Sequence, residues 1–250
     1  MLEQDGTKLL FDPFFVRGKK TRRPPFKELS AAGNIFVTHG HFDHIIDIPA
    51  LLKFGDGKTE VWCTAAPRKT LISFGVERER IHEIEPQDTL NIGPFTVTVY
   101  KGRHVRFDMA LILKTLVNPR ILFHLKALGR IVRDNKLCDE AGETVIYSVS
   151  ASGKSVLLLG SMDLDDDTEY PAGLDLLVVP FQGRSVPAKH LVPIIDRLSP
   201  KKVFLDHFDD AFPPITTLAD PAKFLDLMRT ERPQITVVCP QPGAEWSGEV

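Results

Sequence analysis

The sequence predicts an α/β protein in which helices cover β-sheets, and two patterns support this prediction. Short runs rich in β-branched and aromatic residues recur along the 250-residue chain, and segments with helical periodicity fall between them. The apolar run 174–179 is followed by a helical pattern from residue 187 and by another apolar run at 203–205. This order indicates a β-α-β unit, so we expect parallel pairing in the second half of the chain.

The individual strands are predicted from composition and from flanking turns. Residues 95–100 alternate bulky apolar side chains with threonine, as expected for a strand with one buried face. Most other runs are uniformly apolar and predict burial on both faces. The predicted strands are 9–11, 35–38, 60–63, 95–100, 110–115, 144–149, 156–159, 174–179, 203–205 and 235–238, and the predicted helices are 43–53, 66–74, 119–133, 187–198 and 221–230.

The segment 118–137 is predicted to be a basic amphipathic helical insertion. Ile121, Leu125, Leu128 and Val132 recur at helical spacing, and five lysines and arginines supply positive charge. A helix docked on the body with a solvated polar face is the simplest interpretation. A lid, a dimer contact and a contact with a membrane surface remain open.

Composition favours one domain over residues 1–250 and gives little indication of a partner. The 31 Lys and Arg residues nearly balance the 33 Asp and Glu residues, so no global charge favours nucleic acid or an anionic membrane. Three distant cysteines without a CxxC pair argue against a disulfide framework. With no export signal or apolar run long enough to span a membrane, we expect a cytoplasmic protein with a small-molecule substrate. A homo-oligomer remains open.

The strongest chemical signal is the motif HxHxDH at residues 39–44, directly after the apolar run 35–37. Imidazole and carboxylate are ligands for Zn²⁺ and similar ions. If the chain is still extended there, His39 and His41 project to one side and can bind one ion. Asp43 and His44 begin the next helix and are placed to bind a second ion.

Zinc sites need three or four protein ligands, so further ligands must come from elsewhere in the chain. The best candidates each follow a predicted strand, and His82 and His124 are less well placed. The well-placed candidates are His104, Asp163 and His207.

The chain resembles the metallo-β-lactamase superfamily, and within it the hydrolases similar to L-ascorbate-6-phosphate lactonase. The HxHxDH motif is the most specific part of the resemblance. The segments GTKLLFDP at 6–13, RIHEIEPQDTL at 80–90 and DHFDD at 206–210 are also similar to the family. The resemblance implies an αββα sandwich, in which two mixed β-sheets are flanked by helices.

The resemblance also implies a set of metal ligands and a supporting residue. His39, His41 and His104 would bind one divalent ion, and Asp43, His44 and His207 would bind the other, with Asp12 as a buried support of the metal loop.

The ligand shared by the two ions is the irregular part of this match. The bridging aspartate of the family usually comes directly after a glycine that ends a strand, whereas Gly160 is followed here by Ser161 and Met162. We expect Asp163 to be the bridging ligand, with Asp165 and Ser161 as the alternatives.

This ligand set implies a metal-dependent hydrolase that uses a metal-bound hydroxide. Two Zn²⁺ ions are expected, with Mn²⁺ or Fe²⁺ as alternatives, and Asp43 would orient the nucleophile and steady the leaving group. The charge of the centre favours a small anionic ester, lactone or phosphodiester. Arg103 and Arg106 flank His104, and Arg106 is the candidate substrate-binding residue. The alternative is a non-catalytic or single-metal binding protein that has lost the bridging aspartate.

Overall fold

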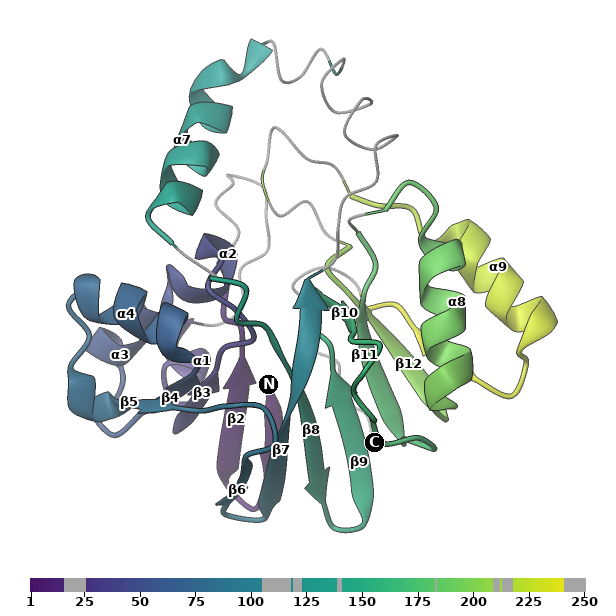
Figure 1. Ribbon diagram of the computed structural model, residues 1–250, viewed down its shortest axis with the longest axis horizontal. Coiled ribbons are helices and arrows are strands. Elements are labelled where there is room, and N and C mark those ends of the chain that lie inside the picture. Colours follow the sequence, from purple (N-terminus) through teal and green to yellow (C-terminus); the bar gives the residue numbers. More distant parts are fainter. Residues whose placement is uncertain are drawn as a thin grey trace.

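Two β-sheets face each other and carry helices on their outer sides (Figure 1). The computed structural model describes residues 1–15, 26–104, 118, 123–138, 141–182, 184–208, 212 and 218–240. Both sheets contain parallel and antiparallel pairs, so the predicted sandwich of mixed sheets flanked by helices is confirmed.

The first sheet has the strand order β1-β2-β3-β4-β5. β1 and β2 are antiparallel, and the remaining neighbours are parallel. The strands are β1 (Leu2–Gln4), β2 (Thr7–Phe11), β3 (Asn34–Phe36), β4 (Glu60–Cys63) and β5 (Ile81–Glu83). The helices of this half are α1 (Phe26–Leu29), α2 (Phe42–Ile45), α3 (Ile48–Phe54) and α4 (Ala65–Ser73), with a 3₁₀ turn at Arg78–Arg80.

The single helix predicted over 43–53 is divided into α2 and α3. Pro49 lies in the first turn of α3, where its missing N–H needs no partner and where it favours the start of a new helix. The division leaves Asp43 and His44 on a short helix of their own, directly after the histidines of the motif.

The second sheet has the order β10-β7-β8-β9-β11-β12-β13, and β6 also pairs with β7. The segment β11-α8-β12 forms the predicted β-α-β unit, because β11 and β12 are parallel. The strands are β6 (Thr89–Ile92), β7 (Phe95–His104), β8 (Val145–Ala151), β9 (Lys154–Leu158), β10 (Met162–Leu164), β11 (Leu176–Pro180), β12 (Lys202–Asp206) and β13 (Thr236–Val238). Helices α8 (Pro187–Leu198) and α9 (Ala222–Glu231) lie on its outer side (Figure 1).

The predicted insertion is partly described as helix α7 (Leu125–Lys136), which lies beyond the strand ends (Figure 1). Leu125 and Val132 are exposed, whereas Ile131 packs against the core of the first half. The predicted strand at 110–115 lies outside the described residues. No helix in the described part of the chain is both long and apolar enough to cross a membrane.

Aromatic packing between the two sheets positions the end of the molecule that carries the HxHxDH motif. The rings of Phe36 and Tyr147 are 5.2 Å apart, and both side chains are fully buried. The Tyr147 hydroxyl donates a hydrogen bond to the carbonyl of Val37. Because burial raises the pKa of Tyr147 well above its usual value, the phenol keeps this proton. The second sheet is thereby joined to the end of β3, where the HxHxDH motif begins.

Candidate metal centre

The loop that carries the HxHxDH motif is held at its start by the carboxylate of Asp12. The backbone N–H of Thr38 donates to Asp12 Oδ1 at 2.8 Å, and the Thr38 hydroxyl donates to Asp12 Oδ2 at 2.7 Å. The carbonyl of Thr38 accepts a hydrogen bond from Val145 in the second sheet. Both sheets therefore fix the direction in which the chain leaves β3.

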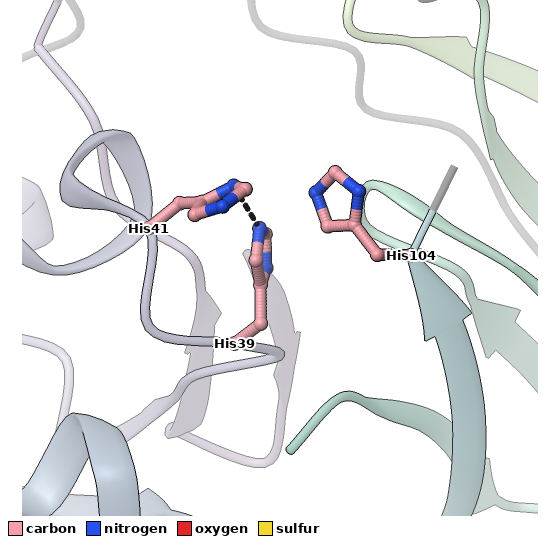
Figure 2. Close-up of side chains that lie close together, drawn as sticks. All are labelled: His39, His41 and His104. Carbon is pink, nitrogen blue, oxygen red and sulfur yellow. Dashed lines mark hydrogen bonds between the residues drawn. The ribbon is translucent and has the colours of Figure 1, made fainter. Parts of the chain in front are cut away.

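His39, His41 and His104 form the first ligand group (Figure 2). One nitrogen from each ring lies within 4.8 Å of the others. His39 and His41 come from the loop after β3, and His104 is the last residue of β7. His39 Nε2 lies 3.0 Å from His41 Nδ1, and the ring of His104 is centred 5.0 Å from that of His39. The fold thus brings the end of β7 against a loop that lies far from it in the sequence.

Burial keeps His39, the innermost imidazole of the first ligand group, neutral. His39 is fully buried, and burial together with the neighbouring imidazoles lowers its pKa well below the ordinary value. A neutral imidazole has a free nitrogen lone pair, which is the form that coordinates a metal ion.

Asp43, His44 and His207 form the second ligand group, again with one donor atom each within 4.8 Å of the others. Asp43 and His44 lie on α2, and His207 follows β12 with a left-handed backbone at φ 53°. The rings of His39 and His44 are centred 4.1 Å apart, so the two groups adjoin.

Asp12 also supports the second group directly. Its Oδ2 lies 3.0 Å from His44 Nδ1. Burial opposes the charged form of His44, but the charges of Asp12 and Asp43 outweigh burial and raise the pKa of His44 to about 9. A carboxylate behind an imidazole is the usual partner of a metal-binding histidine, because it fixes the ring and increases the basicity of the other nitrogen.

A cavity of about 190 Å³ adjoins the second group. Its wall combines apolar side chains with three carboxylates. The lining residues are Phe11, Asp12, Phe14, Thr38, Asp43, His44, Leu158, Gly160, Val178, Asp206 and His207.

The donor chemistry fits divalent metal ions. Five imidazoles and one carboxylate converge in two groups of three, and catalytic zinc sites commonly use three protein ligands. Asp12 behind His44 supplies the supporting contact that such ligands require.

Ser161, one of the alternatives to Asp163, contacts the second group. Its Oγ lies 3.3 Å from His44 Nε2 and 3.0 Å from His207 Nε2. Gly160 allows this approach, because its φ is 58° and a Cβ atom there would come within 2.8 Å of Thr38. Of the three alternatives named from the sequence, Ser161 is the one that lies against the candidate metal ligands.

Asp163, the residue expected to bridge the two ions, lies apart from both ligand groups. In the pairing of β10 with β7, Met162 is opposite His104 and Asp163 is opposite Arg103. Since successive side chains of a strand point to opposite faces, Asp163 faces away from His104. Its Oδ2 lies 3.3 Å from Arg103 Nη2 and 3.7 Å from His190 Nε2. The strand register therefore keeps Asp163 apart from both ligand groups.

The other candidates also lie away from the two groups. Asp165 pairs with Lys101 at 3.1 Å, and hydrogen bonding to Lys101 lowers the pKa of Asp165. His82 stacks on Trp62, and His124 is exposed at the start of α7. Arg106, the expected substrate-binding residue, lies outside the described residues.

Comparisons with known proteins agree with this architecture. A family model described as "Beta-lactamase superfamily domain" matches residues 7–208. A UPF0173 metal-dependent hydrolase of Salinibacter ruber is 26% identical over 224 residues, which are 88% of this chain and 84% of that protein. Another UPF0173 metal-dependent hydrolase, from Rhizobium meliloti, is 32% identical over 108 residues, but the match spans only 41% of this chain and 43% of that relative.

The fold has a counterpart among solved structures. Igni18, a metallo hydrolase from Ignicoccus hospitalis, superposes with a TM-score of 0.65 at 16% identity, covering 97% of this chain and 91% of Igni18. At this identity the likeness concerns the fold, whereas the family model covers most of the sequence, including the motif and both groups of ligands. The chain therefore belongs to the metallo-β-lactamase superfamily.

Proposed function

We propose that this protein is a metal-dependent hydrolase of a small anionic ester, lactone or phosphodiester. The observation that carries the proposal is the convergence of His39, His41 and His104 beside Asp43, His44 and His207. Two relatives carry the name metal-dependent hydrolase, which supports the same reaction class. We further propose zinc as the ion, with manganese or iron as alternatives, since all three accept imidazole and carboxylate ligands.

Bound divalent ions would lower the pKa of a coordinated water and polarise the oxygen of the scissile group. The residues of the chain supply position and charge around that chemistry. Asp43 has a carboxylate that can accept a hydrogen bond from the attacking water and orient it, while Asp12 holds His44 in place. Tyr147 and Thr38 keep the loop fixed between the sheets.

The cavity beside the second group supports a small substrate. Its volume of about 190 Å³ is below the range of roughly 300–1,000 Å³ that is usual for drug-sized ligands. Two divalent ions would carry more positive charge than Asp43, the one carboxylate of the two described groups, and a bound hydroxide can neutralise. A phosphate or carboxylate group of the substrate would neutralise part of the remaining positive charge. This agrees with the resemblance to hydrolases similar to L-ascorbate-6-phosphate lactonase. The three cysteines are free, which supports a reducing, cytoplasmic setting.

Metal content and hydrolysis by the purified protein test the proposal. We expect bound divalent metal and turnover of at least one substrate in a panel of lactones, carboxylic esters and phosphodiesters, each in a neutral and an anionic form. His41→Ala and His207→Ala should each lower metal content and reduce turnover by at least ~100-fold, because each removes a ligand from one group. His124→Ala is the matched control and should keep both, since His124 is exposed at the start of α7.

Absence of metal from the wild-type protein, or equal turnover by wild type and both ligand variants, would refute the hydrolase. Equal turnover of neutral and anionic substrates would refute the anionic preference alone.

A further inference from the structure

The second ligand group has a neutral hydroxyl at the position where the family resemblance implies an acidic ligand shared by both ions. Ser161 Oγ lies 3.0 Å from His207 Nε2 and 3.3 Å from His44 Nε2. Among the described residues that form the two groups, Asp43 is the one carboxylate. The position of the other acidic side chains nearby decides whether one of them could supply the missing charge.

The neighbouring acidic residues Asp12 and Asp206 make other contacts and do not belong to either ligand group. Asp12 accepts two hydrogen bonds from Thr38 and lies 3.0 Å from His44 Nδ1, on the far side of that ring from Nε2. Asp206 Oδ1 accepts a hydrogen bond from the backbone N–H of His207 at 2.7 Å.

Asp163 also lies away from both ligand groups. It faces Arg103 and His190 on the opposite side of β10 from Met162, the residue paired with His104. Moving it to the ligands would require turning β10 over and breaking the pairing with β7.

Charge repulsion between the two ions lowers the affinity for the second ion. Two divalent cations bound to adjacent groups repel each other, and an anionic ligand between them offsets that repulsion. A serine hydroxyl provides a dipole but no charge. Whichever group binds the first ion, the second ion therefore binds more weakly than it would with a carboxylate at position 161.

We propose that Ser161 leaves the two-metal centre one anionic ligand short, so that the protein alone retains one ion and an anionic group of the substrate completes binding of the second. The proposal rests on the proposed metal-dependent function. The cavity beside Asp43, His44 and His207 gives a small phosphate or carboxylate group access to this position. The anion would then be a structural part of the centre as well as a feature of the substrate.

Metal counting tests the proposal without any assay of activity. The full-length protein is dialysed against micromolar buffered Zn²⁺, with and without inorganic phosphate as the probe, and bound zinc is measured per chain. We expect about one zinc without phosphate and about two with it. Ser161→Asp should bind two without phosphate, with at least a ~10-fold lower Kd for the second ion in calorimetry. Ser161→Asn, which matches aspartate in shape but not in charge, should behave like the wild type.

The possible results test the role of Ser161 separately from the metal-dependent function. Failure of the wild type to bind zinc, and to bind manganese or iron in parallel dialyses, would refute the metal-dependent function itself. Two zincs of equal affinity without phosphate, no response to phosphate, or a Ser161→Asp variant that binds no more than Ser161→Asn would overturn the role of Ser161. Thermal unfolding of both variants shows whether the fold is retained, and Ser161→Ala offers a smaller neutral replacement if Ser161→Asn is unstable.

Discussion

The two ligand groups lie side by side but obtain their charge differently. The first consists of three imidazoles, and burial keeps His39 in its neutral form. The second contains Asp43, and Asp12 stands behind His44. One short motif thus supplies candidate ligands to two groups, of which only the second contains a carboxylate. The difference shows that the surrounding carboxylates, rather than the histidine pattern, distinguish the two positions.

The pH dependence of stability should separate the two groups most clearly in the metal-free protein. The pKa of His44 in the folded chain is about 9, above its ordinary value of 6.5, so its stabilisation is complete below pH 6.5 and is lost as pH rises through 9. The pKa of His39 is lowered, so His39 costs stability as pH falls below 6.5. The His44 contribution amounts to roughly 3 kcal/mol at most.

Urea unfolding of chelator-treated protein between pH 5 and 9 measures these contributions. His44→Gln should remove most of the loss between pH 6.5 and 9, and His39→Gln should remove part of the loss below pH 6.5. Identical pH profiles for wild type and His44→Gln would show that the pair of Asp12 and His44 has no such linkage.

Substitution of the two aspartates should sharpen the contrast between a supporting carboxylate and a distant one. Asp12→Asn keeps the shape but removes the charge behind His44 and weakens the acceptor for Thr38, so we expect a ~10–100-fold loss of metal affinity. Asp163→Asn should leave metal affinity within about twofold, because Asp163 faces Arg103 and His190 instead of the ligands. Competition with a chromophoric chelator measures the zinc affinity of both variants. A loss of more than twofold in Asp163→Asn would show that Asp163 contributes to metal binding.

The sequence was most informative where the candidate ligands lie together in the chain or follow strands that its apolar patterns predict. The HxHxDH motif lies within six residues, and His104 and His207 follow strands that the apolar patterns predict. Six of the seven ligands named from the sequence therefore converge in the structure, and Asp163 is the exception. The αββα architecture followed from the family resemblance and is confirmed.

The position of Asp163 could not be read from the sequence, because it depends on register. The three-residue strand β10 is too short to give a periodic pattern, and its pairing with β7 decides which face each side chain occupies. The left-handed turn at Gly160, which brings Ser161 to the ligands, has a local signal in the glycine itself. The close approach to Thr38 that requires this glycine is a contact between distant segments, which no local pattern contains.

Gly160→Ala tests how closely the second sheet must approach the metal loop. A Cβ atom at Gly160 would lie 2.8 Å from Thr38 Cγ2 and 3.1 Å from Asp12 Oδ2. Gly153→Ala is the matched control, since Gly153 also has a positive φ, at 75°, but a Cβ atom added there would have no neighbour within 4 Å.

Both glycine variants should lose about 1–2 kcal/mol of stability from the left-handed backbone. Gly160→Ala should lose about 1 kcal/mol more and should also weaken zinc binding, because the contact displaces Thr38 and Asp12 from the loop. Equal unfolding free energies and equal zinc affinities for the two variants would show that the loop tolerates a wider separation from the Gly160 turn. That result would also show that the contact of Ser161 with the second ligand group does not depend on the close approach of Gly160 to Thr38.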